Sequence, residues 1–372
     1  MTRSRKYINR LSVLADVSGS EFSLSGWSHS AEEVREAVTA VLPEVEVREA
    51  SGVEEGRNTV YLVTADGSVG TDSADHPDLV LKVGTHHFAV GCRAEPHVLD
   101  AVADRTEIPV PEVYGTGHHR EDPYFVAEYV PGVNPSADSG TLGPERLDPE
   151  TSERVCVEAG RNLGELHDAF PADCWGMLGV ERGADDLELV REFPDWPTYF
   201  EEWLSSSVER LEETRFADLV PVLEDRVAPM ADELREYGPF DPVMSHGDYR
   251  LGNLVLDPDS TPVTAAVIDW GTPTAVPAVH DLAVTEAILL DWPAFDADRQ
   301  RYLRERLYDG YRETNAEVLD RDDFKAHRRL SRFGARLRLM VNLSEEMTGR
   351  SEAAVDARAR EHREALREWG VS

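Results

Sequence analysis

Two oxygen-bearing side chains, Asn253 and Asp269, bracket a segment whose pattern predicts a β-hairpin. Apolar residues 254–256 and 263–268 flank the sequence DPDSTP, which is rich in turn formers. Antiparallel pairing of the two runs brings Asn253 and Asp269 to the same end of the hairpin, because opposed Cα atoms lie about 4.5–5.5 Å apart. A carboxylate and an amide oxygen, completed by water and phosphate oxygens, suit magnesium.

A third candidate, Asp248, lies five residues before Asn253 in the sequence HGDYRLGN. A carboxylate held that close to a metal–phosphate site can accept the proton of an attacking hydroxyl. Gly247 and Gly252 suit a loop with unusual backbone angles. The alternative is that Asp248 and Asp269 are ordinary turn aspartates in an acidic chain. The combination of HGD, the spacing to Asn253 and an apolar strand ending in IDW favours the chemical interpretation.

A single lysine stands out in the first third of the chain. The only lysines are Lys6, Lys82 and Lys325, and Lys82 alone lies in an apolar run, DLVLKVG. Burying an unpaired charge costs several kcal/mol, so this pattern predicts a partner for Lys82. The alternative is a surface lysine on an edge strand, with its ammonium extended into water. Arginine serves at nearly all other basic positions, which favours a ligand-binding role.

The sequence HGDYRLGNLVLD followed by AVIDW resembles the aminoglycoside phosphotransferase family, which is similar in fold to the protein kinases. The resemblance implies an α+β, two-lobed protein-kinase-like fold, with a small antiparallel-sheet N-terminal lobe and a larger, mainly helical C-terminal lobe. It also implies ATP and magnesium as cofactors. Asp248 then corresponds to the catalytic base, Asn253 and Asp269 to the magnesium ligands, and Arg250 to a residue near the transferred phosphate.

The same resemblance implies a set of nucleotide-binding residues in the N-terminal lobe. Lys82 would contact the α- and β-phosphates and pair with a glutamate of the following helix. A turn after the first strand would hold phosphate through its backbone, and the lobe connector would bind adenine. The implied residues are Lys82, Glu95, Gly56, Asn58, Glu128, Tyr129 and Val130.

We therefore predict transfer of the γ-phosphate of ATP to a hydroxyl of a small molecule. One alternative is a catalytically silent nucleotide-binding regulatory protein of the same fold, which would be expected to lack the base or a metal ligand. A protein kinase is a third possibility, but no A-P-E-like segment follows IDW. Relatives often continue with Gly-Asp-Pro before Asp-Leu-Ala, whereas this chain has GTPTAVPAVHDLA. The departure concerns the substrate class rather than the nucleotide site.

The elements that must position these residues divide the chain at a connector, residues 128–134. Residues 1–127 form the predicted nucleotide-binding lobe, with 1–30 left unassigned, and 135–372 form the predicted catalytic and substrate-binding lobe. The first lobe is predicted to consist mainly of strands with two helices. One helix covers 31–42 and is capped by Ser30, and the other covers 95–105 with Pro96 in its first turn. Helical patterns in the second lobe cover 150–169, 196–214, 217–237, 281–290, 297–314 and 323–368.

Composition limits the partners. The 372 residues include 72 acidic and 38 basic side chains, a net charge of −34, which argues against nucleic acid and anionic membranes. This charge favours a surface adapted to high salt over a site for a cationic substrate, for which the acidic stretches 181–192 and 195–202 are the candidates. Three cysteines without metal-ligand spacing and a polar N-terminus predict a cytoplasmic protein with reduced thiols.

Overall fold

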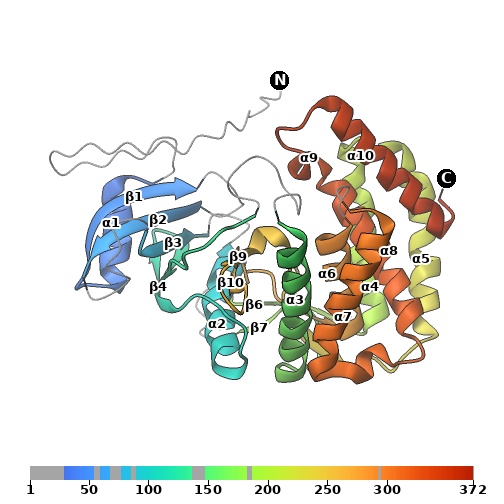
Figure 1. The fold of residues 1–372 in the computed structure, drawn as a ribbon, viewed down its shortest axis with the longest axis horizontal. Coiled ribbons are helices and arrows are strands. Elements are labelled where there is room, and N and C mark those ends of the chain that lie inside the picture. Colours follow the sequence, from blue (N-terminus) through green and yellow to red (C-terminus); the bar gives the residue numbers. More distant parts are fainter. Residues whose placement is uncertain are drawn as a thin grey trace.

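The computed structural model describes residues 29–53, 59–67, 77–84, 89–135, 147–181, 187–291 and 295–371. Gly56 and Asn58 lie outside the described residues, as does most of the unassigned segment 1–30. A strand-rich part and a larger helical part lie at opposite ends of the molecule (Figure 1). This is the α+β, two-lobed arrangement that the sequence predicted.

The strand-rich part is one antiparallel sheet of order β1-β2-β3-β5-β4. Helix α1 packs against it, and a capping box formed by Ser30 and Glu33 starts that helix as expected. Strand β3 is central, with Lys82 opposite Val60 of β2 and Phe125 of β5. Lys82 is therefore not on an edge strand, and the surface-lysine interpretation is wrong. The elements are α1 Ala31–Val41, β1 Glu46–Val53, β2 Thr59–Asp66, β3 Leu79–Val83, α2 Ala89–Arg105, β4 Val113–His119 and β5 Asp122–Glu128.

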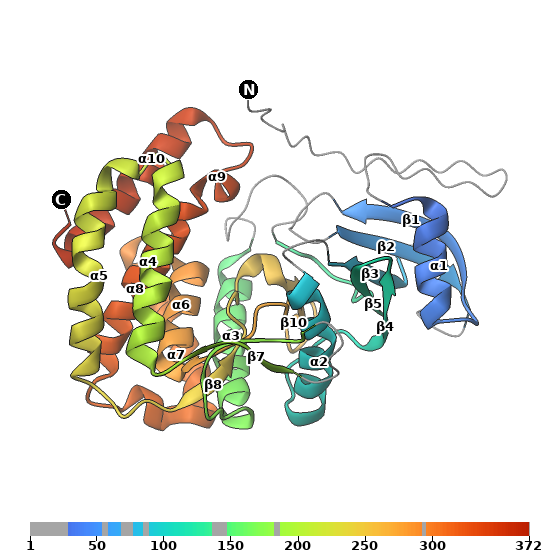
Figure 2. The ribbon, with the colours of Figure 1, turned by 180° about the vertical axis from the view of Figure 1, so that it is seen from behind.

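The helical part packs its long helices side by side, with α4, α5 and α8 forming one group and α3 and α7 another (Figure 2). Aromatic and aliphatic side chains of α4, α5 and α8 share a core that includes Phe200, Leu223 and Phe333. The helices are α3 Pro149–Ala169, α4 Trp196–Arg210, α5 Val220–Arg235, α6 Ala278–Leu290, α7 Ala297–Leu319, α8 Phe324–Val341, α9 Leu343–Glu346 and α10 Glu352–Ala365. None of the helices in the described ranges combines the length and apolar character needed to cross a bilayer.

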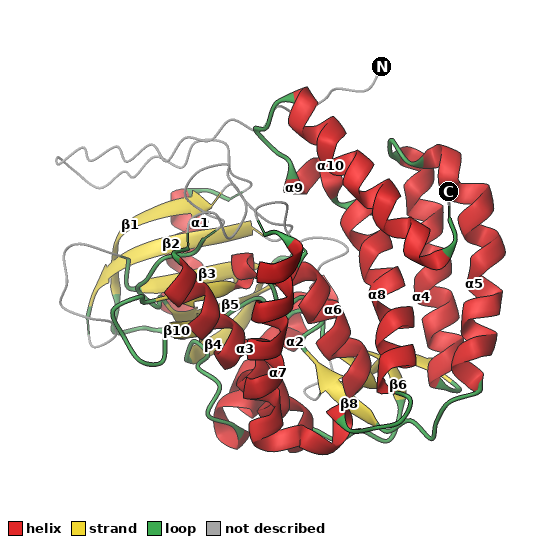
Figure 3. Cartoon of the chain, turned by 45° about the vertical axis from the view of Figure 1, so that its right-hand side comes forward, coloured by secondary structure: helices red, strands yellow, loops and turns green. Residues whose placement is uncertain are grey.

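Two small sheets join the helical part to the rest (Figure 3). The predicted hairpin forms from β9 Leu254–Leu256 and β10 Thr264–Val267. A four-stranded sheet of order β7-β6-β11-β8 was not predicted. Its strands are β6 Trp175–Gly179, β7 Glu188–Phe193, β8 Pro242–Ser245 and β11 Thr274–Pro277. All four strands are short, and β6 and β7 are also half-exposed, so their apolar pattern is weak.

Two predicted helices differ from the structure. The segment 323–368 is not one helix, because α8 ends at Val341 and the short α9 follows it. Gly349 then takes a left-handed backbone conformation, and Ser351 caps a new helix, α10. Helix α2 already includes Ala89, so Pro96 lies inside it rather than in its first turn. One turn before Glu95, Gly91 approaches the backbone closely: a Cβ there would lie 2.4 Å from the carbonyl oxygen of Gly271. This contact brings α2 against the segment that follows Asp269.

Candidate active site

The hairpin brings Asn253 and Asp269 together. Leu254 pairs with Val267, and the backbone N–H of Ile268 donates to the carbonyl oxygen of Asn253 at 2.9 Å. The next residue, Asp269, has a φ of 64°, a left-handed conformation that is uncommon for a residue with a side chain. The chain therefore turns sharply at the end of β10, and Asp269 leaves the hairpin there.

His246 braces this arrangement from the preceding loop. Its Nε2–H donates to the carbonyl oxygen of Ile268 at 3.1 Å, and its Nδ1 accepts the backbone N–H of Asp248 at 3.2 Å. Burial lowers the pKa of His246, which keeps the imidazole neutral with one donor and one acceptor nitrogen. The ring thus links the loop that carries Asp248 to the strand that ends at Asp269.

Asp248 is held by three side chains. Its Oδ2 accepts from Arg250 Nε at 3.0 Å and from Asn253 Nδ2 at 3.1 Å, while its Oδ1 accepts from Arg338. Burial by itself would raise the pKa of this carboxyl, but Arg338 and Arg250 outweigh burial and hold the pKa below its usual value. Asp248 is therefore ionised and fixed in orientation.

Arg338 was missed by sequence reasoning. It lies on α8, ninety residues from Asp248, and also donates to the carbonyl oxygen of Gly247 at 2.6 Å. The surrounding sequence, SRFGARLRLMV, shows an arginine-rich amphipathic helix and no motif. Nothing local distinguishes Arg338 from the other arginines of that helix.

Lys82 connects the two ends of the site. Its ammonium donates to Glu95 Oε2 at 2.5 Å and to Asp269 Oδ1 at 2.7 Å. Both Lys82 and Glu95 are buried. Burial would lower the pKa of Lys82, but Glu95 and Asp269 raise it above its usual value, so the ammonium stays charged. The partner that the sequence required for Lys82 is present in the form of two carboxylates.

The connector after β5 lies against the hairpin. Val133 exchanges two backbone hydrogen bonds with Leu256 of β9, at 2.7 and 2.9 Å. Within the predicted adenine-binding residues, the N–H of Glu128 donates to the Glu112 carbonyl and that of Tyr129 donates to the Asp78 carbonyl. Of the three predicted backbone N–H groups, the one at Val130 is thus the candidate for contact with a base.

The donor set at the hairpin fits magnesium. Asn253 uses its Nδ2 for Asp248, and Asp269 uses its Oδ1 for Lys82, so Asn253 Oδ1 and Asp269 Oδ2 have no hydrogen-bond partner among the described residues. Two protein oxygens with water and substrate phosphates are typical of magnesium sites. Within the described ranges no cluster of three or more His, Cys, Asp or Glu could hold a metal ion by itself.

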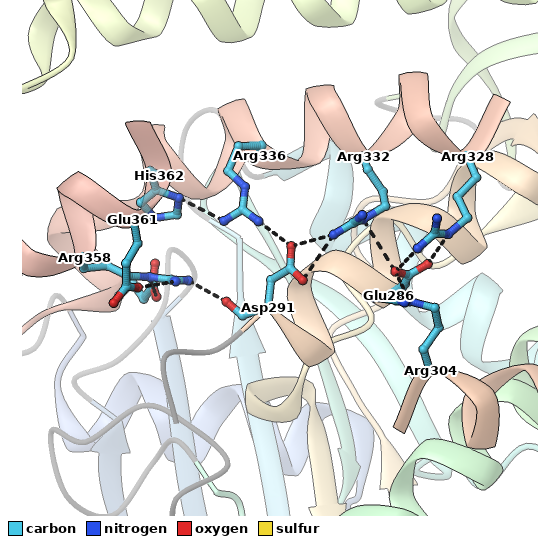
Figure 4. A network of polar contacts seen from close by, with 10 residues as sticks. Glu286, Asp291, Arg304, Arg328, Arg332, Arg336, Arg358, Glu361 and His362 are labelled. Carbon is cyan, nitrogen blue, oxygen red and sulfur yellow. Dashed lines mark hydrogen bonds and ion pairs between the residues drawn. The ribbon is translucent and has the colours of Figure 1, made fainter. Parts of the chain in front are cut away.

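A buried network of ion pairs fixes α8, the helix that supplies Arg338 (Figure 4). Glu286 of α6 is fully buried and accepts from Arg304 of α7 at 2.6 Å and from Arg328 of α8 at 2.5 and 2.6 Å. One and two turns further along α8, Arg332 and Arg336 donate to Asp291, just after α6. The network ties α8 to α6 over more than two turns.

The network makes a testable prediction about stability. We expect Glu286→Gln to lower the free energy of unfolding by about 3–5 kcal/mol at pH 7, because three arginines lose their buried carboxylate. The arginines lower the pKa of Glu286 to about 2 from an ordinary value of 4.5. The stability that ionised Glu286 contributes should be complete above pH 4.5 and should disappear as the pH falls toward 2. The difference in unfolding free energy between Glu286→Gln and wild type should therefore be smaller at low pH than at pH 7.

Urea unfolding of both proteins at pH 7 and at pH 3 measures this difference. Glu313→Gln, which removes a half-exposed carboxylate paired with Arg161, is the matched control and should cost less than about 1 kcal/mol. A cost for Glu286→Gln no larger than that of the control would contradict the role given to the network.

The two-lobed fold is of the kinase-like type. The model of the phosphotransferase enzyme family (APH) matches residues 49–316, and the chain belongs to this family. The resemblance seen in the sequence is thereby confirmed. A comparison with curated protein sequences gave no match.

Solved structures share the fold at low sequence identity. A candidate fructosamine-3-kinase from Haemophilus somnus 129PT has a TM-score of 0.57 and 15% identity, covering 89% of this chain and 97% of its own. A second candidate fructosamine-3-kinase, from Thermobifida fusca YX-ER1, has a TM-score of 0.52 and 23% identity, covering 87% and 96%. The streptomycin–ATP complex of APH(2")-IIa has a TM-score of 0.52 and 12% identity, covering 90% and 97%.

Proposed function

We propose that this protein transfers the γ-phosphate of ATP, with magnesium, to a hydroxyl group of a small molecule. The observation that carries the proposal is two sets of side-chain contacts that meet at one end of the hairpin. Glu95 holds Lys82, Lys82 holds Asp269, and Asp269 lies at the same hairpin end as Asn253, which holds Asp248. Family membership supports phosphotransfer, and a related structure contains ATP.

Each residue has a proposed task. Lys82 contacts the α- and β-phosphates, and Asn253 Oδ1 with Asp269 Oδ2 would hold the magnesium ion, which, when bound, neutralises charge on the phosphates. Asp248 accepts the proton of the attacking hydroxyl. Arg250, whose Nε is occupied by Asp248, directs its remaining N–H groups toward the transferred phosphate. The chain contributes mainly positioning and charge stabilisation.

The silent regulatory alternative lacks support from these residues. A protein that had lost catalysis would be expected to lack the base or a metal ligand, and here Asp248, Asn253 and Asp269 are all present and in contact with the rest of the set.

The proposal predicts ADP release that depends on magnesium and on an added alcohol. We expect a panel of small alcohols, assayed in molar salt because of the charge of −34, to give turnover with at least one member. Removal of magnesium with a chelator should abolish it. Binding of magnesium ATP without turnover of any alcohol in a broad panel would instead favour the regulatory alternative.

A further inference from the structure

The oxygen of Asp248 that remains for an acceptor hydroxyl is the one beside Arg338. Oδ2 already accepts two hydrogen bonds, from Arg250 and Asn253, which uses both of its lone pairs. Oδ1 accepts from Arg338 alone among the described residues, so one lone pair remains. A hydroxyl that approaches Asp248 as the base therefore lies next to the guanidinium of Arg338.

Arg338 is rigidly held but not enclosed. The carbonyl oxygen of Gly247 and Asp248 Oδ1 fix its guanidinium, and the Glu286 and Asp291 network fixes its helix (Figure 4). Its side chain is nevertheless 26% exposed, and that of Arg250 on the other side of Asp248 is 41% exposed. Both guanidinium groups can therefore contact a small molecule that reaches Asp248.

Two positively charged side chains lie beside the base, Arg250 and Arg338. Although the chain has a net charge of −34, both side chains that form ion pairs with Asp248 are positively charged arginines. Besides Asp248, the carboxylates of Asp269 and of Glu345, which is exposed on α9, interact electrostatically with Arg250. In the acidic stretches that could have bound a cation, Glu202 pairs with Arg191 and Glu201 with Arg235, while residues 182–186 lie outside the described ranges.

We propose that the acceptor is an alcohol that carries an anionic group, a carboxylate or a phosphate, close to its reacting hydroxyl, and that Arg338 binds this group while Arg250 serves the transferred phosphate. The proposal rests on the proposed function. Guanidinium forms charge-assisted, two-point hydrogen bonds with such groups. An anionic acceptor must also approach the negative γ-phosphate, and the two arginines offset that repulsion.

The reaction is then balanced within the site. The acceptor oxygen forms a bond to the γ-phosphorus, and the bond from that phosphorus to the β–γ bridging oxygen breaks, so that ADP leaves. The proton of the hydroxyl moves to Asp248 and afterwards to solvent. Arg338 is a specificity-determining residue in this scheme, since it contacts the acceptor and holds the base without exchanging a proton.

Matched acceptor series test the proposal. One series is glycerate, glycerol 3-phosphate, glycerol and 3-amino-1,2-propanediol, and a second is gluconate, glucitol and glucamine. We expect the anionic member of at least one series to exceed its neutral and cationic partners by about tenfold or more in kcat/KM. Glycerate and glycerol 3-phosphate separate a preference for carboxylate from one for phosphate.

Variants of α8 assign the preference to one residue. Arg338→Met should reduce the anion-to-neutral ratio to about one while the KM for ATP stays within about twofold, and Arg338→Lys should restore part of the ratio. Arg329→Met is the matched control, because Arg329 lies on the same helix but pairs with Glu233. A merely structural role of Arg338 would lower turnover for all acceptors without changing the ratio.

The outcomes separate this inference from the proposed function. Turnover of neutral or cationic alcohols at rates equal to or above their anionic partners would overturn the inference and leave the phosphotransferase function standing. An unchanged ratio in Arg338→Met would also overturn it. Absence of phosphorylation of any alcohol, in these series and in the wider panel, would remove the proposed function and the inference together.

Discussion

Asp248→Asn is expected to lower kcat by about 10²- to 10⁴-fold, the range typical of removing a general base. The amide keeps the shape of the side chain, but its single oxygen can accept from Arg250 or from Arg338 and not from both, and it cannot take the proton of the acceptor hydroxyl. Binding of magnesium ATP should remain close to wild type. Steady-state kinetics together with calorimetric titration of the nucleotide measure the two effects separately.

Asp259→Asn is the matched control for this variant. Asp259 is an exposed residue in the turn of the same hairpin, and its substitution should leave kcat unchanged. Near-normal kcat in Asp248→Asn would show that another group accepts the proton, and the assignment of Asp248 as the base would have to be withdrawn.

The second large effect is expected at Lys82. Lys82→Met should reduce kcat/KM for ATP by about 10²-fold or more, because it removes the ammonium that Glu95 and Asp269 position and that is proposed to contact the nucleotide phosphates. Lys82→Arg should also fail, since a planar guanidinium does not replace a compact ammonium between Glu95 and Asp269. Lys325→Met, at an exposed position, is the control and should retain activity.

A stability measurement must accompany the Lys82 variants. Removing the ammonium leaves Glu95 buried beside Asp269 without its cation, which can cost about 3–5 kcal/mol. The double variant Lys82→Met with Glu95→Gln removes the unpaired buried charge, so it should recover stability but not the use of ATP. Recovery of activity in the double variant would mean that Lys82 acts on folding rather than on the nucleotide.

Local pattern was sufficient for much of the catalytic part. The hairpin follows from two short apolar runs and a turn-rich loop, and its end places Asn253 beside Asp269. The cap at Ser30 follows from the residue types in one helical turn. The need for a partner at Lys82 follows from the cost of burying a charge in an apolar strand. The short strands β6 and β7 escaped prediction because they are half-exposed.

The sequence alone was sufficient to propose Lys82, Asp248, Asn253 and Asp269 as candidates, because strands and turns depend on neighbours within a few positions, but Arg338 carried no local signal. Only the tertiary structure decided which of them meet. Lys82 contacts Asp269 across 187 positions, and Arg338 contacts Asp248 across 90. Such contacts depend on how α2 packs against the segment after β10 and on how the ion-pair network holds α8 against α6. An arginine on an amphipathic helix has the same local pattern whether it faces water or a catalytic carboxylate, so packing alone distinguishes the two.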